Sequence, residues 1–216
     1  MRSNATSRLS TLPAPPLKTT SRLAPVNTGA ATSSTTPAIR VRPATAADAE
    51  GIRTIYNHEV ENTTATMDLV TRSLADQVEW LAARTGAFAA LVAVRPASGD
   101  ADPRFVIPGE SGSEEILGFA SLSPYKERAA YRPTVEDSVY VRRDLGRRGV
   151  GRVLLGELIE VARTSGFHSM MARIEASGEA SRGLHEACGF REVGIEREVG
   201  RKFNRWLDVV LMQKML

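Results

Sequence analysis

Residues 138–156 read Ser138-Val-Tyr-Val-Arg-Arg-Asp-Leu-Gly-Arg-Arg-Gly-Val-Gly-Arg-Val-Leu-Leu-Gly156, and this run predicts three connected elements. Its first residues are apolar and β-branched, which predicts a strand, and its last residues are apolar at helical spacing, which predicts a helix. Between them lies a basic turn that contains Gly149 and Gly151. Such an arrangement forms a cradle for a phosphate group, because the first N–H groups and the dipole of a helix attract an anion.

The turn differs from two familiar nucleotide-binding motifs. It has neither the Gly-x-Gly-x-x-Gly of dinucleotide-binding proteins nor the Gly-Lys-Ser/Thr of a P-loop. The alternation of strands and helices around it, with antiparallel hairpins at both ends of the chain, predicts a mixed α/β sheet. The sequence therefore predicts a phosphate-binding α/β domain of another kind.

The composition bounds the class of protein. The chain has 216 residues, which is one domain or one domain with extensions, and 42% of them are hydrophobic, which is enough for an ordinary core. The formal net charge of +3 is too small to indicate a nucleic-acid-binding protein. Cys188 is the single cysteine, so we expect no internal disulfide and no metal site. No apolar run approaches the roughly 18 residues of a membrane helix, and we expect no membrane partner.

The N-terminal segment, residues 1–38, is rich in Ser, Thr, Pro and Ala, and the first acidic residue of the chain is Asp48. Such a composition buries too little apolar surface to order itself, which predicts a disordered tail. An organelle transit peptide is the alternative, since these are also rich in Arg and Ser and poor in acids. We therefore expect a cytoplasmic protein, or a mitochondrial one if the segment is a transit peptide.

The remaining chain, residues 39–216, is expected to form the folded domain. Helices are predicted from residue 46, from residue 74, over 149–165 and over 179–188. Residues 58–67 and 124–137 read as polar loops, and residues 95–114 as a long surface loop or insertion. Strands are predicted at 39–42, 87–94, 116–122, 139–141, 168–174, 191–199 and 206–214.

Several strings, taken with the glycine turn, resemble one family. They are Ile-Arg-Val-Arg-Pro-Ala-Thr at 39–45, Ile-Tyr-Asn-His-Glu-Val-Glu-Asn-Thr-Thr-Ala-Thr at 55–66, Thr-Val-Glu-Asp-Ser-Val-Tyr-Val at 134–141, Leu-His-Glu-Ala-Cys-Gly-Phe at 184–190 and Lys-Phe-Asn-Arg-Trp-Leu-Asp-Val-Val-Leu-Met-Gln at 202–213. The combination resembles the GNAT superfamily of N-acetyltransferases, and more narrowly the phosphinothricin and methionine sulfone (or sulfoximine) N-acetyltransferases. It covers the chain from residue 39 to the end, apart from the segment 95–114. It implies an acyl-CoA N-acyltransferase fold, with a central, mostly antiparallel sheet flanked by helices.

The resemblance implies transfer of an acetyl group from acetyl-CoA to the primary amine of a small L-amino-acid-like substrate, by direct attack in a ternary complex. Two alternatives remain. The acceptor could be another amine (a polyamine, an aminoglycoside or a protein N-terminus), or the protein could be a non-catalytic acyl-CoA sensor. The segment 202–206 resembles a part that helps to form a homodimer in this subfamily.

The resemblance also implies which residues bind the donor. Those expected to hold the diphosphate are Arg147, Arg148, Gly149, Val150, Gly151 and Arg152. Backbone groups of Val139, Tyr140 and Val141 are implied to pair with the pantetheine arm. The chain departs from the family at two positions: Gly146 stands where Arg or Gln is usual, and Gly178 stands where an asparagine contacts CoA.

The catalytic and acceptor residues follow from the same matches. Glu136 is expected to be the carboxylate that accepts the amine's proton, with Asp137 as the competing candidate. His185 stands where many relatives have a tyrosine, and it is expected to protonate the leaving thiolate, orient CoA or act as a second base. The acceptor is expected to contact the residues Lys126, Arg128, Tyr131, Asn62 and Thr63.

Overall fold

The computed structural model describes residues 38–216 except Ala89, Ser111, Gly146 and Arg147. All but the last residue of the expected N-terminal tail, and Arg147 of the expected phosphate turn, therefore lie outside the described residues. No helix within the described ranges has the length and apolar character needed to cross a membrane.

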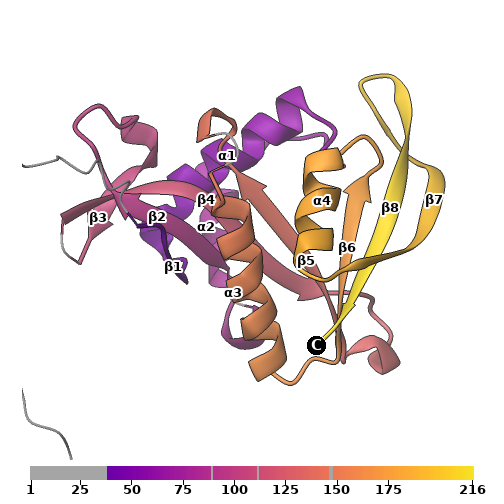
Figure 1. The fold of residues 1–216 in the computed structure, drawn as a ribbon. Coiled ribbons are helices and arrows are strands. Elements are labelled where there is room, and N and C mark those ends of the chain that lie inside the picture. Colours follow the sequence, from indigo (N-terminus) through magenta and orange to yellow (C-terminus); the bar gives the residue numbers. More distant parts are fainter. Residues whose placement is uncertain (1–37, 89, 111, 146–147) are drawn as a thin grey trace, which may run out of the picture. The chain divides into compact units, whose positions relative to one another are not determined.

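The described residues form a mixed α/β fold (Figure 1). The helices are α1 (Ala49–Asn62), α2 (Leu74–Ala82), α3 (Val150–Thr164) and α4 (Glu179–Ala187). The strands are β1 (Arg40–Pro43), β2 (Leu91–Pro96), β3 (Val106–Gly109), β4 (Gly112–Pro124), β5 (Thr134–Val141), β6 (Ser169–Glu175), β7 (Arg191–Lys202) and β8 (Arg205–Met215). Short 3-10 turns η1 to η5 lie at Ala46–Asp48, Gly86–Phe88, Pro103–Phe105, Ala129–Tyr131 and Arg143–Leu145.

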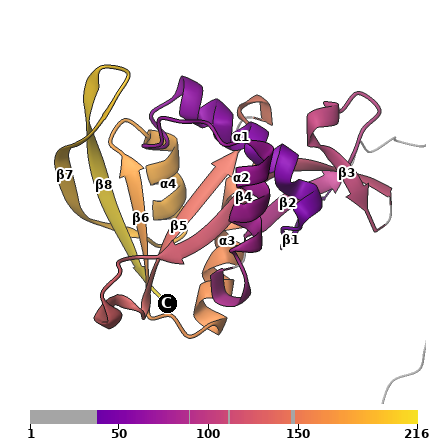
Figure 2. The same cartoon turned by 180° about the vertical axis from the view of Figure 1, so that it is seen from behind.

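The strands form one sheet in the order β1-β2-β4-β5-β6-β8-β7, and β3 pairs with β4. Every neighbouring pair is antiparallel except β5 and β6, which are parallel. Helices α3 and α4 cover one face, and α1 and α2 lie on the other, over β2, β4 and β5 (Figures 1 and 2). The predicted fold class, a mostly antiparallel sheet flanked by helices, is confirmed.

Strands β5 and β6 pair over only part of their length. The three pairs are Thr134 with Ser169, Val135 with Met170 and Glu136 with Met171. Beyond Glu136 the two strands no longer pair, so the edge of β5 from Asp137 to Val141 that faces β6 lacks a strand partner. The unpaired edge opens a gap in the middle of the sheet, and an extended ligand can pair with it as an added strand would.

Apolar side chains pack on both faces of the sheet. On one face Leu154, Leu155 and Leu158 of α3 are fully buried against the strands. On the other face Ile52 of α1 and Phe119 of β4 belong to a second buried cluster. The alternation of strand residues between the two clusters fixes which side chains face α3 and α4 and which face α1 and α2.

Three sequence-based expectations about loops are wrong. Residues 124–137 were expected to be a loop, but β5 already begins at Thr134, so Glu136 and Asp137 lie on the strand. Residues 58–67 were expected to be a loop, but α1 continues to Asn62 because Glu59 and Val60 extend its buried face. Segment 95–114 contains the end of β2, all of β3 and the start of β4, with Phe105 and Ile107 buried. In the last two places a charged or Pro- and Gly-containing sequence suggested a loop, whereas part of each segment is helical or strand-paired and buries a few of its side chains.

Candidate active site

The predicted phosphate cradle begins α3. Gly149 precedes the first helical residue with φ of +81°, a left-handed conformation that favours glycine. No side chain caps the helix at this residue. Among the described residues, the first N–H groups of α3 therefore have no side-chain cap and can bind an anion, with Arg148 and Arg152 exposed beside them. Val150 is buried and anchors the turn to the core.

Glycines also set the distance between the elements that border the gap. A side chain at Gly151 would come within 3.1 Å of Leu184 Cδ2, so the start of α3 packs closely against α4. Gly178 precedes α4, and a Cβ there would lie 2.9 Å from the carbonyl oxygen of Glu175. The departure at Gly178 is thus built into the local packing, because a larger residue would require the backbone to move.

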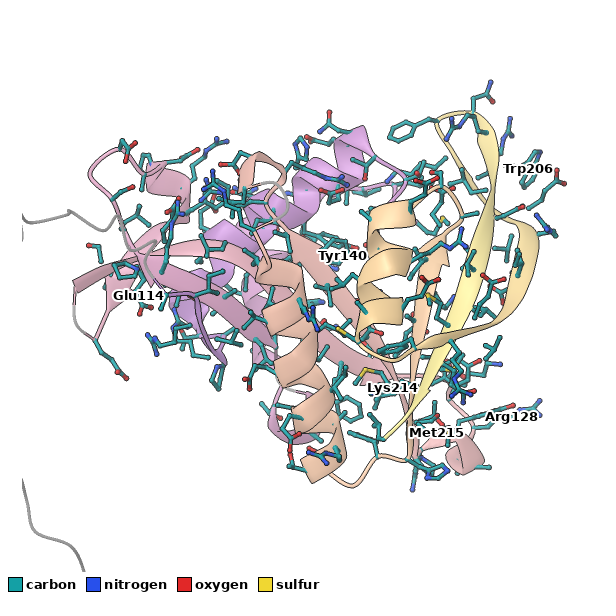
Figure 3. All side chains as sticks on the ribbon, viewed as in Figure 1. Glu114, Arg128, Tyr140, Trp206, Lys214 and Met215 are labelled. Carbon is teal, nitrogen blue, oxygen red and sulfur yellow. The ribbon has the colours of Figure 1, made fainter. Side chains whose placement is uncertain are left out.

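The edge of β5 beside the gap is held rigidly. Val139 and Val141 pack toward α3, whereas Tyr140 points to the other face. The ring centroid of Tyr140 lies 5.2 Å from that of Phe119 and 5.2 Å from that of Tyr56. Figure 3 labels the side chain of Tyr140. With side chains fixed on both faces, the backbone N–H and C=O groups of the unpaired edge are held in place for a ligand.

Glu136 lies at the point where the gap begins. Its neighbour Val135 is buried among the residues that pack with α3, so the side chain of Glu136 projects from the opposite face. Burial raises the pKa of Glu136 above its ordinary value; the positive charge of Arg173 opposes that shift, and the charges of Asp137 and Glu196 add to it. A carboxylate with a raised pKa is a stronger proton acceptor.

Asp137 and His185 form a buried pair on the α4 side of the gap. The Nε2 atom of His185 lies 3.0 Å from Oδ2 of Asp137, and its Nδ1 lies 2.7 Å from the carbonyl oxygen of Ser181. Burial lowers the pKa of His185, but the hydrogen bonds and the charge of Asp137 more than offset this, and the pKa is raised. Both ring nitrogens face oxygen acceptors, so the ring is held as an imidazolium. Asp137 Oδ1 has no hydrogen-bond partner among the described residues.

The predicted acceptor residues fall into two groups at opposite ends of β5. Lys126, Arg128 and Tyr131 lie in the exposed loop that enters β5 at Thr134. The Nζ atom of Lys126 lies 5.2 Å from the ring centre of Tyr131. In Figure 3 Arg128 lies far from Trp206, which is near the start of β8.

Asn62 and Thr63 lie beyond the other end of β5. The Thr63 hydroxyl donates to Oε2 of Glu59 at 2.7 Å, and Glu59 accepts a hydrogen bond of 2.8 Å from Nε of Arg143, which follows β5. An eight-residue strand is about 25 Å long. The structure therefore does not bring Asn62 and Thr63 together with the Lys126 loop.

Sequence reasoning missed Arg173. It follows Met171 by two residues on β6 and so lies on the same face as Glu136. A single arginine in a predicted strand carries no motif, and only the pairing of β5 with β6 places it near the carboxylate. No group of three or more His, Cys, Asp or Glu side chains in the described part of the chain is placed to hold a metal ion.

Comparison with known proteins gives consistent matches. Residues 41–211 match the family model described as an acetyltransferase (GNAT) domain. The chain is 40% identical over 173 residues to the L-methionine sulfoximine/L-methionine sulfone acetyltransferase of Pseudomonas paraeruginosa, covering 80% of this chain and 92% of that one. It is 34% identical over 181 residues to the phosphinothricin N-acetyltransferase of Streptomyces coelicolor, covering 84% and 98%.

Among solved structures, the fold is similar to a GNAT superfamily phosphinothricin acetyltransferase from Sinorhizobium meliloti in complex with acetyl-CoA. The TM-score is 0.70 and the sequence identity 33%, covering 82% of this chain and 88% of that one.

Proposed function

This chain belongs to the GNAT acetyltransferase family and is an N-acetyltransferase, and we propose that it moves the acetyl group of acetyl-CoA to the primary amine of a small L-amino-acid-like acceptor. The relatives named for methionine sulfone, methionine sulfoximine and phosphinothricin support this acceptor class. The observation that carries the proposal is the position of Glu136, a partly buried carboxylate with a raised pKa where β5 and β6 separate.

The chain offers a fitting site for the donor. The uncapped start of α3 is proposed to hold the diphosphate through its backbone N–H groups, and the unpaired edge of β5 is proposed to hold the pantetheine arm. Acetyl-CoA supplies an acetyl group activated as a thioester. The exposed side chains of Arg148 and Arg152 add electrostatic attraction for the diphosphate, and dissolved salt weakens this attraction.

Glu136 and His185 are proposed to handle the protons. An ammonium cannot attack, so Glu136 accepts its proton, directly or through a water. The neutral amine then forms the C–N bond as the C–S bond breaks; the nitrogen gives its second proton to water, and the sulfur leaves as a thiolate. The imidazolium of His185, which Asp137 holds beside the gap, is proposed to protonate or stabilise that thiolate.

A thiol-release assay with acetyl-CoA tests the proposed function. L-methionine sulfone, L-methionine sulfoximine and L-phosphinothricin are compared with spermidine, an aminoglycoside and a peptide with a free N-terminus. We expect rapid CoA release with the three amino acids. Release only with spermidine, the aminoglycoside or the peptide would replace the acceptor class, and uptake of acetyl-CoA in calorimetry without any turnover would favour a sensor.

The phosphate cradle makes a separate prediction. Gly149→Val is expected to weaken acetyl-CoA binding about 5- to 100-fold. A β-branched residue at φ of +81° is strained by about 1–3 kcal/mol, and the free turn relieves that strain by leaving the conformation that binds the diphosphate. Gly156→Ala, also in α3 and with open space around its Cβ, is the matched control and should bind as the wild type does. Calorimetric titration measures both, and equal affinities would remove Gly149 from the donor site.

A homodimer remains a proposal. The β7–β8 hairpin exposes the apolar side chains of Val193, Val199, Phe203 and Trp206, and β7 is an edge strand. We propose that a second copy of this chain packs against this surface. A monomer in sedimentation velocity at micromolar concentration would contradict it.

A further inference from the structure

The face of the sheet opposite α3 carries a second charged group next to Glu136. On β6, Met170, Ala172 and Ile174 belong to the buried cluster that packs with α3, so Met171, Arg173 and Glu175 project from the other face. Glu136 pairs with Met171 across the two strands. Arg173 is therefore the next residue beyond Met171 on the face that carries Glu136, about 7 Å further along the strand.

Arg173 is fixed in place from the opposite side. Its Nη2 donates to Oε2 of Glu196 on β7 at 2.7 Å, and its side chain keeps 40% of its exposure. A guanidinium has five N–H donors, so this ion pair leaves several of them free. The pKa of Glu136, raised by burial, is pulled back by the charge of Arg173, which agrees with their proximity.

The middle of β6 lies beyond the helices that cover this face, whereas at its end Glu175 accepts a hydrogen bond of 2.7 Å from the hydroxyl of Thr64. Helices α1 and α2 lie over β2, β4 and β5, and Figure 2 shows that neither covers the middle of β6. Arg173 is exposed, whereas Met171, two residues earlier on the same face, is buried. The surface thus offers the carboxylate of Glu136 and the guanidinium of Arg173 from residues two strand positions apart on neighbouring strands, beside the buried side chain of Met171.

That pair of charges matches an α-amino acid. Its ammonium and carboxylate are attached to the same carbon, so one molecule can present its amine to a carboxylate and its carboxyl group to a neighbouring guanidinium. Arginine binds a carboxylate through two parallel hydrogen bonds, which fixes orientation as well as position.

We propose that Arg173 binds the carboxylate of the acceptor while Glu136 receives the proton of its amine, so that Arg173 selects α-amino acids over amines that lack a carboxylate. This inference rests on the proposed function and adds a specificity-determining residue to the same site. Arg173 lies on a strand that pairs next to Glu136, whereas Lys126 and Arg128 lie in an exposed loop. Glu196 lies on β7, on the side of β6 away from β5, and holds one nitrogen of the guanidinium before the acceptor arrives.

The test compares two acceptors with the same side chain, L-methionine sulfone and its carboxamide. For the wild type we expect kcat/KM to be higher with the carboxylate. In Arg173→Ala the value for L-methionine sulfone should fall about 10- to 100-fold more than the value for the carboxamide, mainly through KM. Any change in the basicity of Glu136 affects both acceptors and cancels in their ratio.

A conservative variant and a control variant complete the test. Arg173→Lys retains the charge without the paired donors and should recover part of the preference. Arg197→Ala is the matched control: Arg197 lies on β7, pairs with Asp208 at 2.6 Å and is 71% exposed, so its loss should leave the preference unchanged.

The outcomes distinguish a wrong acceptor class from a wrong role for Arg173. If the wild type acetylates neither compound, the proposed acceptor class is wrong. If the wild type prefers the carboxylate and Arg173→Ala keeps that preference, the assignment of Arg173 is overturned while the proposed function stands. Thermal melting shows whether each variant is folded.

Discussion

Glu136→Gln is expected to lower kcat by a factor of about 10² to 10⁴ at saturating acetyl-CoA and neutral pH, the range typical of a lost general base. Glutamine has the same shape but cannot accept the ammonium proton. The affinity for acetyl-CoA should not change, because the expected donor contacts lie on the backbone of β5 and at the start of α3.

The pH dependence of wild-type activity is a second test of Glu136 as the base. The proposed base Glu136 can accept a proton only when it is deprotonated, so activity should fall as the pH drops through its pKa. Burial raises that pKa above the ordinary value of 4.5, so the acidic limb of kcat/KM should lie at a higher pH than for a solvated glutamate. The limb should be absent from the residual activity of Glu136→Gln.

Glu127→Gln is the matched control for this experiment. Glu127 is an exposed carboxylate in the loop before β5, and its replacement should leave both kcat and the acidic limb in place. If Glu136→Gln kept more than about a tenth of the wild-type kcat, the general-base role would have to be given up, because a lost base costs at least 10²-fold.

The parts of the site that follow local rules could be predicted from the sequence. A strand, a turn with Gly149 and Gly151 and a helix were expected at 138–156, and α3 begins at Val150 with Gly149 in the left-handed conformation. Likewise, α4 ends where Gly189 follows with φ of +87°. These features depend on backbone conformation and on spacing within a few residues, which the sequence displays directly.

The parts that depend on strand phase and long-range pairing could not be predicted. Glu136 and Asp137 are adjacent and chemically similar, yet they project from opposite faces of β5. The contact of Asp137 with His185 joins residues 48 positions apart. The position of Arg173 depends on how β5 pairs with β6, and the sequence alone does not specify which residues meet.

The wrong loop prediction at residues 58–67 also came from contacts between residues distant in the chain. Glu59 is buried because Arg143 and Thr63 satisfy its carboxylate, so a charged residue extends α1 where a solvated loop was expected. A buried charge needs partner groups, and here Arg143 is distant in the chain, so the sequence does not show that Glu59 is buried.

The second large effect concerns stability. Asp137→Asn is expected to reduce the free energy of unfolding at pH 6 by about 3–5 kcal/mol, the usual cost of removing one partner from a buried ion pair. Asp137 and His185 are only 7% and 3% exposed, so water cannot replace the lost partner. Urea unfolding measures the change.

The size of this loss should depend on pH. The pKa of His185 is raised in the folded protein relative to its ordinary value of 6.5, so protonation of the ring contributes stability that is fully present below pH 6.5 and lost as the pH rises through the folded-state pKa. In Asp137→Asn that contribution disappears, because the buried ring loses its proton once the carboxylate is gone. The difference between wild type and variant should therefore be largest near pH 6 and shrink at alkaline pH.

A double variant distinguishes charge from packing. Asp137→Asn with His185→Gln leaves two neutral amides in place of the pair, and its stability should lack the pH dependence that the pair produces. Other charges on the surrounding elements are Arg152 of α3, Lys214 of β8, and Arg182 and Glu186 of α4, all unchanged in these variants. A loss in Asp137→Asn of equal size at pH 6 and at alkaline pH would mean that the carboxylate acts through packing alone. His185 would then have no fixed positive charge to offer a leaving thiolate.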